Sequence, residues 1–287
     1  MLVDLVIPWV NNNDNVWQQR YIQYFLAVDY KRVAELRGNR YEDIGLIQYQ
    51  LKLIEKNMPF VRYIFLLVSN KEQINFPINK NKVKVVLHEQ FIPYKYLPTF
   101  NSTTIEMFLH NIKDLSEHFI YANDDMLPFN ELKESDFFEG DKIKMNYRME
   151  EYHENDNSFR NQCLNSYQHI CDLLGMGHNK TSFIKPDHSM SPMIKSHLKL
   201  VVESLGDIVL KPIRAWRTPE QHNQYLYLDY EILTNNCLRN QISFLYTEFK
   251  NENDINEMGD YQIVCLNQIP NKYSKQVLNK LEEILCK

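Results

Sequence analysis

The amino-acid sequence predicts an α/β fold, in which a mostly parallel sheet is flanked by helices. The stretches 2–10 and 62–69 are continuously apolar, as strands buried on both faces are. Shorter apolar stretches at 83–88 and 118–122 predict two further strands. Helical periodicity lies between these strands, and a repeated strand–helix–strand order favours a parallel sheet with helices on its faces.

Two helices are expected between the predicted strands. In the first, apolar residues recur at helical spacing over 44–54, and Pro59 follows the end of the helix. In the second, an apolar stripe covers 105–115, and Thr103 and Glu106 form a capping-box pattern before it. Both helices are expected to cover the sheet with their apolar faces.

The second half of the chain has a weaker pattern. A polar loop leads into a helix over 151–174, a strand is expected at 210–216, and an aromatic-rich helix at 221–233. A last strand at 262–266 precedes an amphipathic helix at 274–287.

No repeat, low-complexity tract or clear linker interrupts the sequence. We therefore expect one domain over 1–287, with a helical insertion at about 134–210. The order of elements is that of a Rossmann-like or GT-A-like core.

Composition excludes several classes of function. A net charge of −5 argues against a nucleic-acid binder, which usually has a basic surplus. The five cysteines contain no CxxC pair, so a cysteine-rich zinc site is not expected. Their odd number and scattered positions are typical of reduced thiols in a cytosolic protein. Neither GxGxxG nor GxxxxGK[ST] occurs, so a glycine loop for nucleotide phosphates is not expected. The first ten residues lack a basic leader, and the run 63–68 is too short to span a bilayer.

Polar residues follow several predicted strands directly. "NNND" (11–14) follows the first, Ser69 and Asn70 the second, and "NDD" (123–125) a later one. Because ligands of such sheets bind beyond the carboxyl ends of the strands, these residues are expected on one rim.

Each candidate group also has an ordinary structural interpretation. Asp124 and Asp125 suit a Mg²⁺ or Mn²⁺ site that bridges to substrate phosphates, or they cap a turn. His188, in a loop between two prolines, is a candidate general base, although most histidines are structural. Arg214 and Arg217 are candidates for a phosphate clamp or are solvated charges.

A helix N-terminus offers a further candidate. Asn101 and Ser102 precede the predicted second helix, where free N–H groups can receive an anion. Simple capping explains the same residues equally well.

Taken in order, the motifs resemble the Stealth family of sugar-phosphate transferases. Four motif regions of that family have counterparts spread over nearly the whole chain. The stretches that carry the resemblance are "DLVIPWVNNNDNVW" (4–17), 40–69, "LPTFNSTTIEMFLHNIKDLSEHFIYANDDM" (97–126), "HSMSPMIKS" (188–196), "RTPEQHNQYLYLDY" (217–230) and "VCLNQ" (264–268). The stretch from Leu97 to Asp125 is the most specific of them.

The resemblance implies transfer of a sugar-1-phosphate from a nucleotide diphosphate sugar to a hydroxyl of an acceptor glycan, in capsule or cell-surface polysaccharide synthesis. A nucleoside monophosphate leaves, and the donor is expected to be UDP-linked. His188, Arg217 and Asp125 are the implied catalytic residues, and Asp124, Asp125 and Asn267 the implied ligands of Mg²⁺ or Mn²⁺. The expected substrate-binding residues are Asn11, Asp14, Arg40, Asn101, Ser102 and Asn123.

Two alternatives stay open at this point. A metal-dependent glycosyltransferase would release a nucleoside diphosphate instead. The second alternative is an inactive homologue that binds a glycan or a nucleotide. It stays open because Leu46, Gln221 and Gln268 stand at positions where the family commonly has acidic residues. We expect the protein in the cytoplasm, attached peripherally to the inner face of the cell membrane. We expect no nucleic-acid partner.

Overall fold

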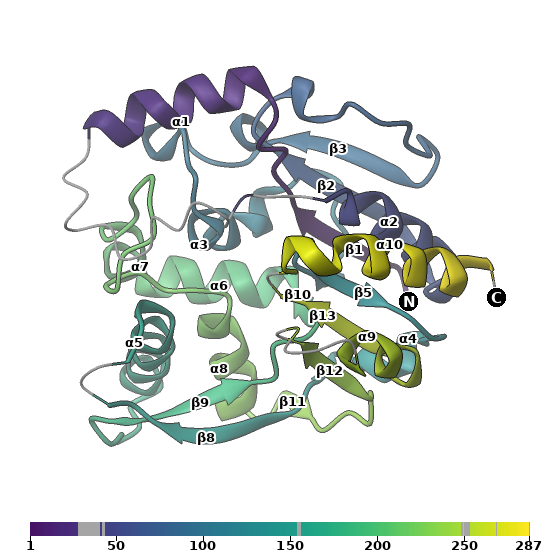
Figure 1. The fold of residues 1–287 in the computed structure, drawn as a ribbon. Coiled ribbons are helices and arrows are strands. Elements are labelled where there is room, and N and C mark those ends of the chain that lie inside the picture. Colours follow the sequence, from purple (N-terminus) through teal and green to yellow (C-terminus); the bar gives the residue numbers. More distant parts are fainter. Residues whose placement is uncertain are drawn as a thin grey trace.

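The central sheet has the predicted, mostly parallel arrangement (Figure 1). The computed structural model describes residues 1–27, 41, 44–153, 156–247, 249, 253–267 and 269–286. Four strands of the sheet are parallel, and the edge strand β10 runs antiparallel to β4. In spatial order the strands are β10 (Ser191–Ile194), β4 (His118–Tyr121), β1 (Val3–Pro8), β2 (Val61–Val68) and β3 (Val83–Leu87).

The continuous apolar runs explain why these strands are central. Large side chains such as Phe65 and Phe119 are 1% and 0% exposed. Burying a side chain of this kind stabilises a fold by about 1.5–3 kcal/mol, so each strand contributes strongly to the core. Helices α2 (Leu46–Asn57) and α6 (Lys195–Leu205) pack against β2 and β10 respectively.

A second sheet carries the C-terminal half of the fold. It consists of β12 (Phe244–Thr247), β13 (Ile263–Leu266) and β5 (Met126–Pro128). The predicted amphipathic helix is α10 (Asn271–Cys286), and its apolar stripe packs in a separate cluster with side chains of this sheet. Helix α9 (Asn253–Glu257) joins the same cluster through Ile255.

The stretch 134–210 is only partly the helical insertion that we expected. Helices α5 (Ser158–Leu173) and α6 are present, but strand β10 of the same stretch completes the central sheet. Strands β8 (Tyr147–Glu151) and β9 (Ser182–Pro186) form an antiparallel pair below the central sheet, on the opposite side from α1 (Figure 1). Because β8 is mostly exposed, its sequence lacks the apolar run that revealed the buried strands. The remaining elements of the stretch are α4 (Glu134–Phe137), β6 (Phe138–Glu139), β7 (Lys142–Lys144) and α7 (Asp207–Leu210).

Two other expectations are wrong in detail. The helix expected over the stripe 105–115 is the short α3 (Ser102–Met107), and a 3₁₀ turn, Leu109–Asn111, follows it. The strand expected at 210–216 is a turn-rich loop, in which Pro212 has no N–H for a sheet ladder. The sequence did not predict helix α1 (Asn15–Ala27). It did predict the aromatic-rich helix, which is α8 (Tyr225–Leu233). The short strand β11 (Cys237–Leu238) pairs with β7.

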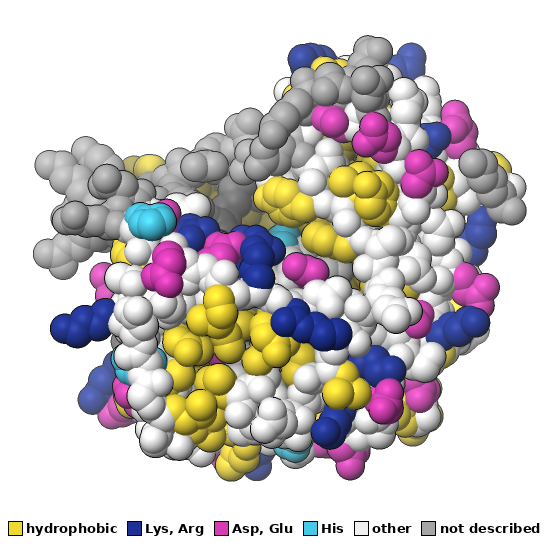
Figure 2. Space-filling model, turned by 90° about the horizontal axis from the view of Figure 1, so that it is seen from below, with side chains coloured by type: hydrophobic (Ala, Val, Ile, Leu, Met, Phe, Trp, Pro, Cys, Tyr) yellow, Lys and Arg dark blue, Asp and Glu magenta, His cyan; other side chains and the backbone are white. Residues whose placement is uncertain are grey.

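The surface bears on possible partners. Seen from the side of β8 and β9, Lys and Arg side chains are interspersed with Asp and Glu (Figure 2). Among the residues described, no helix has the length and apolar character needed to cross a bilayer.

Candidate active site

A large cleft lies at the carboxyl ends of β1, β2 and β4. Its volume is about 1600 Å³, and two sets of side chains line it. We call the first set the strand-end wall; it comprises Ser69, Asn101, Ser102, Asp124 and Asp125. We call the second set the facing wall; it comprises Phe159, Lys185, His188, Phe244 and Tyr246. Of the residues predicted on one rim, Ser69 and the stretch 123–125 therefore line one side of this cleft.

The two adjacent aspartates occupy a tightly held turn between β4 and β5. The Met126 N–H donates to the Asn123 carbonyl at 3.1 Å, which closes the turn. Gln50 of α2 donates its Nε2 to the carbonyls of Asn123 and Met126, each at 2.7 Å. From β13, the Leu266 N–H donates to the Asp125 carbonyl at 2.8 Å. Three separate elements thus fix the backbone that presents both carboxylates.

The oxygen atoms of this turn fit a hard divalent cation. Oδ1 of Asp125 is buried without a hydrogen-bond partner among the described residues. Asp124 and Asn267 line the same cleft, and Asn267 follows β13 where that strand meets Asp125. No three His, Cys, Asp or Glu side chains converge in the part of the chain that the structure describes. Mg²⁺ commonly takes one or two carboxylates and completes its shell with water and substrate phosphates, so this donor set suffices.

His188 lies in the loop between β9 and β10. Its Nδ1 is 3.4 Å from the Tyr225 hydroxyl, and its ring lies edge-on to Phe159 and Tyr246. Burial lowers the pKa of His188; Asp125 opposes this effect, while Lys185 adds to it. The imidazole is therefore expected to be neutral at pH 7, the form that a general base needs.

Arg217 reaches the strand-end wall from the loop before α8. Its Nη2 donates to the Ser102 hydroxyl at 2.7 Å. It is also close enough to Glu106 and His188 to lower the pKa of both groups. The predicted catalytic residues His188, Arg217 and Asp125 are therefore close to one another.

Glu106 is a residue of the cleft whose place the sequence did not reveal. It was expected to cap α3, but the N-cap is Asn101, whose side chain accepts from the Thr103 N–H. Glu106 instead accepts hydrogen bonds from the Gln224 N–H at 2.6 Å and the Tyr121 hydroxyl at 3.1 Å. Burial raises the pKa of Glu106, and Arg217 lowers it. This carboxyl is well placed to orient Arg217.

The alternative interpretation of Asn101 as a cap agrees with its contacts. Besides capping α3, it donates Nδ2 to Oε1 of Gln221 at 2.8 Å. Gln221 also accepts from the Thr218 N–H and donates to the carbonyls of Pro212 and Trp216. Gln221 therefore uses both ends of its amide to brace the loop that carries Arg217.

Several predicted residues are not brought into the cleft. Asp14 is buried and accepts from the Asn70 and Gln73 side chains at 2.8 and 2.9 Å, and Asn11 also bonds to Gln73. Trp9, two residues before Asn11, lines the cleft instead. Arg214 is exposed and donates to backbone carbonyls nearby.

The two remaining predicted substrate-binding residues are Asn123 and Arg40. Asn123 lines the cleft, and its carbonyl closes the aspartate turn. Arg40 lies outside the described residues.

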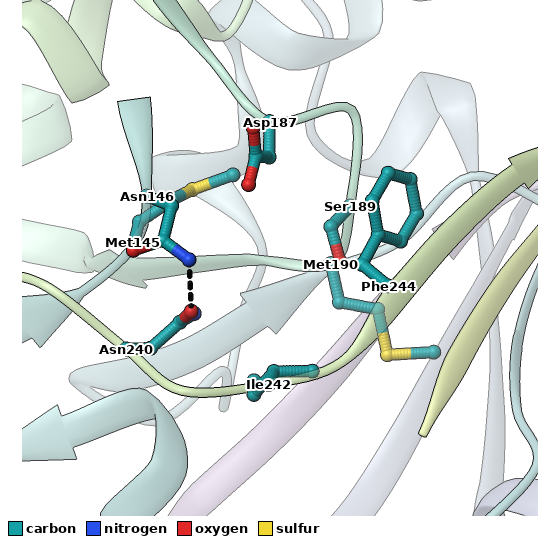
Figure 3. A pocket seen from close by; sticks show the side chains of 8 residues that line it. All are labelled: Met145, Asn146, Asp187, Ser189, Met190, Asn240, Ile242 and Phe244. Atoms are coloured by element: carbon teal, nitrogen blue, oxygen red, sulfur yellow. Dashed lines mark hydrogen bonds between the residues drawn. The ribbon is translucent and has the colours of Figure 1, made fainter. Parts of the chain in front are cut away.

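A small cavity of about 10 Å³ lies behind the His188 loop, large enough for roughly one water molecule (Figure 3). Asn146 donates to Asn240 across it at 2.9 Å. Asp187 and Phe244 line both this cavity and the cleft, so it backs the facing wall.

Sequence comparisons find the strongest similarity in the region of the strand-end wall. Residues 40–146 match the family Stealth protein CR2, conserved region 2. The capsular polysaccharide phosphotransferase fcs1 of Haemophilus influenzae is 42% identical over 139 residues, which is 47% of this chain and 37% of that protein. LcbA of Aeromonas hydrophila, with the same description, is 38% identical over 49% of this chain and 39% of its own length.

A third relative covers a larger share of its own length. The capsular polysaccharide phosphotransferase eps5J of Streptococcus thermophilus is 36% identical over 50% of this chain and 60% of that protein. The matches thus span between about a third and three fifths of these curated relatives.

Similarity to solved structures is weaker. The galactosyltransferase LgtC, in complex with donor and acceptor sugar analogs, overlaps with a TM-score of 0.42 at 10% identity, covering 98% of this chain and 95% of that chain. An overlap of this size is too low to transfer a binding site. The sequence matches are stronger: residues 40–146 are similar to the Stealth family, and about half of the chain is similar to capsular polysaccharide phosphotransferases.

Proposed function

We propose that this protein transfers a sugar-1-phosphate from a nucleotide diphosphate sugar to a hydroxyl of an acceptor glycan during synthesis of a cell-surface polysaccharide. The observation that carries the proposal is the proximity of His188, Arg217 and Asp125 in one cleft. The relatives described as capsular polysaccharide phosphotransferases support the same reaction class.

The reaction makes one bond to phosphorus and breaks another. The acceptor oxygen attacks the phosphorus that carries the sugar, and the bond from that phosphorus to the bridging oxygen breaks. The nucleoside monophosphate leaves with the electron pair, and the acceptor proton passes to His188. Because the C1–O bond of the sugar is not broken, the donor keeps its anomeric configuration.

The side chains of the cleft divide this work. Arg217, oriented by Ser102 and Glu106, is placed to contact the phosphoryl oxygens, where its planar fork of donors stabilises developing charge. Asp124, Asp125 and Asn267 would hold Mg²⁺ or Mn²⁺, which supplies positive charge to the diphosphate when bound.

We also propose that the donor is UDP-linked and that the reaction occurs in the cytoplasm, at the inner face of the membrane. The five cysteines are all free, which supports a reducing compartment.

The identity of the released nucleotide tests the proposed reaction. Purified protein is incubated with UDP-linked and other nucleotide sugars, Mg²⁺ or Mn²⁺, and candidate glycan acceptors. A nucleoside monophosphate is the expected product, formed together with a phosphodiester-linked sugar. A nucleoside diphosphate would instead show glycosyl transfer, and an absence of turnover with every donor would favour a binding protein. Arg214→Ala, at an exposed position outside the cleft, is the matched control and should be as active as the unmodified protein.

A further inference from the structure

Three aromatic side chains of the facing wall lie in the cleft lining with His188. Tyr246 is 41% exposed, whereas Phe159 and Phe244 are half-buried, and all three line the cleft. An exposed aromatic ring inside a cleft contributes little to folding, because much of its surface stays in water. The exposure of Tyr246 therefore suggests a surface for a ligand.

The strand register explains why these rings face the cleft. Strand β12 runs parallel to β13, with Phe244 opposite Ile263 and Tyr246 opposite Cys265. Side chains alternate along a strand, so Phe244 and Tyr246 share one face, and Leu245 packs on the other face with the α10 cluster. The sequence FLY thus presents two aromatic rings to the cleft.

The same register places Tyr246 near the reacting groups. Its cross-strand neighbour Cys265 is paired on its other side with Met126, the residue directly after Asp125. The ring centroid of Tyr246 is 5.6 Å from that of His188. Tyr246 consequently lies beside the candidate base, on the strand next to the one that borders the aspartate turn.

The geometry of phosphoryl transfer indicates which substrate approaches this wall. Attack takes place roughly in line with the leaving group, so the acceptor enters opposite the nucleoside monophosphate. The candidate groups that contact the diphosphate, Asp124, Asp125 and Arg217, meet at the strand-end wall. His188, which takes the acceptor proton in the proposed reaction, belongs to the facing wall. The acceptor must therefore lie beside His188 and its aromatic neighbours.

We propose that Tyr246, with Phe159 and Phe244, forms the subsite for the acceptor sugar. One face of a pyranose ring consists of C–H groups and packs against an aromatic ring, while its hydroxyls need polar partners at the edge. Such partners are at hand, because Lys185, Asp187 and Arg148 line the same cleft. This assignment rests on the proposed function for its choice of an acceptor, but binding of a sugar at Tyr246 can be measured without turnover.

The test compares Tyr246→Ala with Tyr246→Phe. The probes are methyl glycosides of glucose, galactose and N-acetylglucosamine, and binding is followed by saturation-transfer NMR. At least one glycoside should bind the unmodified protein; Tyr246→Ala should weaken that binding about tenfold, and Tyr246→Phe should retain it, because the ring face is kept. Tyr94→Ala removes a tyrosine that is 89% exposed and does not line the cleft, so it should have no effect.

Kinetics with an active donor and acceptor supply the second arm. Tyr246→Ala should raise the acceptor KM about tenfold and change the donor KM less than about twofold. A raised donor KM with an unchanged acceptor KM would overturn the proposal and assign the ring to the nucleotide. Glycoside binding that is equal in Tyr246→Ala and the unmodified protein would also overturn it. If the protein releases no nucleoside monophosphate, the proposed function fails, and the NMR experiment still decides whether Tyr246 binds a sugar.

Discussion

The two walls of the cleft differ in how the chain builds them. The strand-end wall lies wholly within residues 40–146, the part that matches the Stealth region. The facing wall lies wholly after residue 146 and is assembled from α5, β9, the loop after β9, and β12. In the proposed reaction the strand-end wall of this protein binds the donor, and the facing wall binds the acceptor.

The largest expected effect comes from His188→Ala on the facing wall. Loss of the base should lower kcat by about 10²–10⁴-fold, the usual contribution of general base catalysis. Donor binding should change little, because the groups expected to bind the diphosphate lie on the other wall. Turnover and donor binding, measured by nucleotide release and calorimetry, check both parts. His178→Ala, at a histidine outside the cleft, is the control. Retained turnover in His188→Ala would remove this residue from the mechanism.

Asp125→Asn is the corresponding change on the strand-end wall. With the carboxylate charge lost, metal-dependent donor binding should weaken at least about tenfold, while binding of a methyl glycoside should be unchanged. Calorimetry with Mn²⁺ and donor gives the first quantity. A chelator should abolish turnover of the unmodified protein, and Asp141→Asn, at a highly exposed position, should behave like the unmodified protein. Equal metal affinity in Asp125→Asn would refute the metal assignment.

The sequence predicted one wall better than the other for a physical reason. The buried strands of the central sheet have continuous apolar runs, and polar residues directly after them must lie at their ends. Asp124 and Asp125 were therefore found from order along the chain alone. Tyr246 could not be found in this way, because only the pairing of β12 with β13 brings it near Asp125.

Side-chain partners were also beyond the sequence. Asp14 follows a strand as Asp124 does, yet the Asn70 and Gln73 side chains donate to its Oδ2 and the Val16 N–H donates to its Oδ1. Position after a strand therefore did not show which acids line the cleft. Glu106 fits a capping pattern, but burial beside Arg217 gives it another role. The residues alone made His188 and Arg217 candidates with an equally ordinary structural interpretation, and only the family resemblance favoured a catalytic role for them.

The electrostatic coupling between Lys185 and His188 within the facing wall predicts a shift in pH dependence. The Lys185 ammonium helps to lower the pKa of His188, so Lys185→Met should raise that pKa. The base form would then be lost at a higher pH, and the acidic limb of the kcat/KM profile should move upward. In the unmodified protein this limb should lie below the ordinary histidine value of 6.5. Lys199→Met, at an exposed site outside the cleft, should leave the profile unchanged. A profile that is unmoved by Lys185→Met would show that the limb does not report His188.

The smallest effect on activity is expected from Gln50→Leu, which changes no group that contacts substrate. The substitution leaves the carbonyls of Asn123 and Met126 without their side-chain donor, so the free energy of unfolding should fall by about 1–3 kcal/mol. Urea denaturation measures that loss, and Gln48→Leu, exposed on the same helix, is the matched control.

The kinetic consequence of Gln50→Leu separates the two walls. A looser turn misplaces Asp124 and Asp125, so the donor KM should rise several-fold in the presence of Mg²⁺, whereas the acceptor KM should not change. If both KM values rose together, the two walls would share one mechanical unit, and the division between a donor wall and an acceptor wall would have to be abandoned. A donor KM equal to that of the unmodified protein would show instead that β13, through its bond to the Asp125 carbonyl, holds the turn without α2.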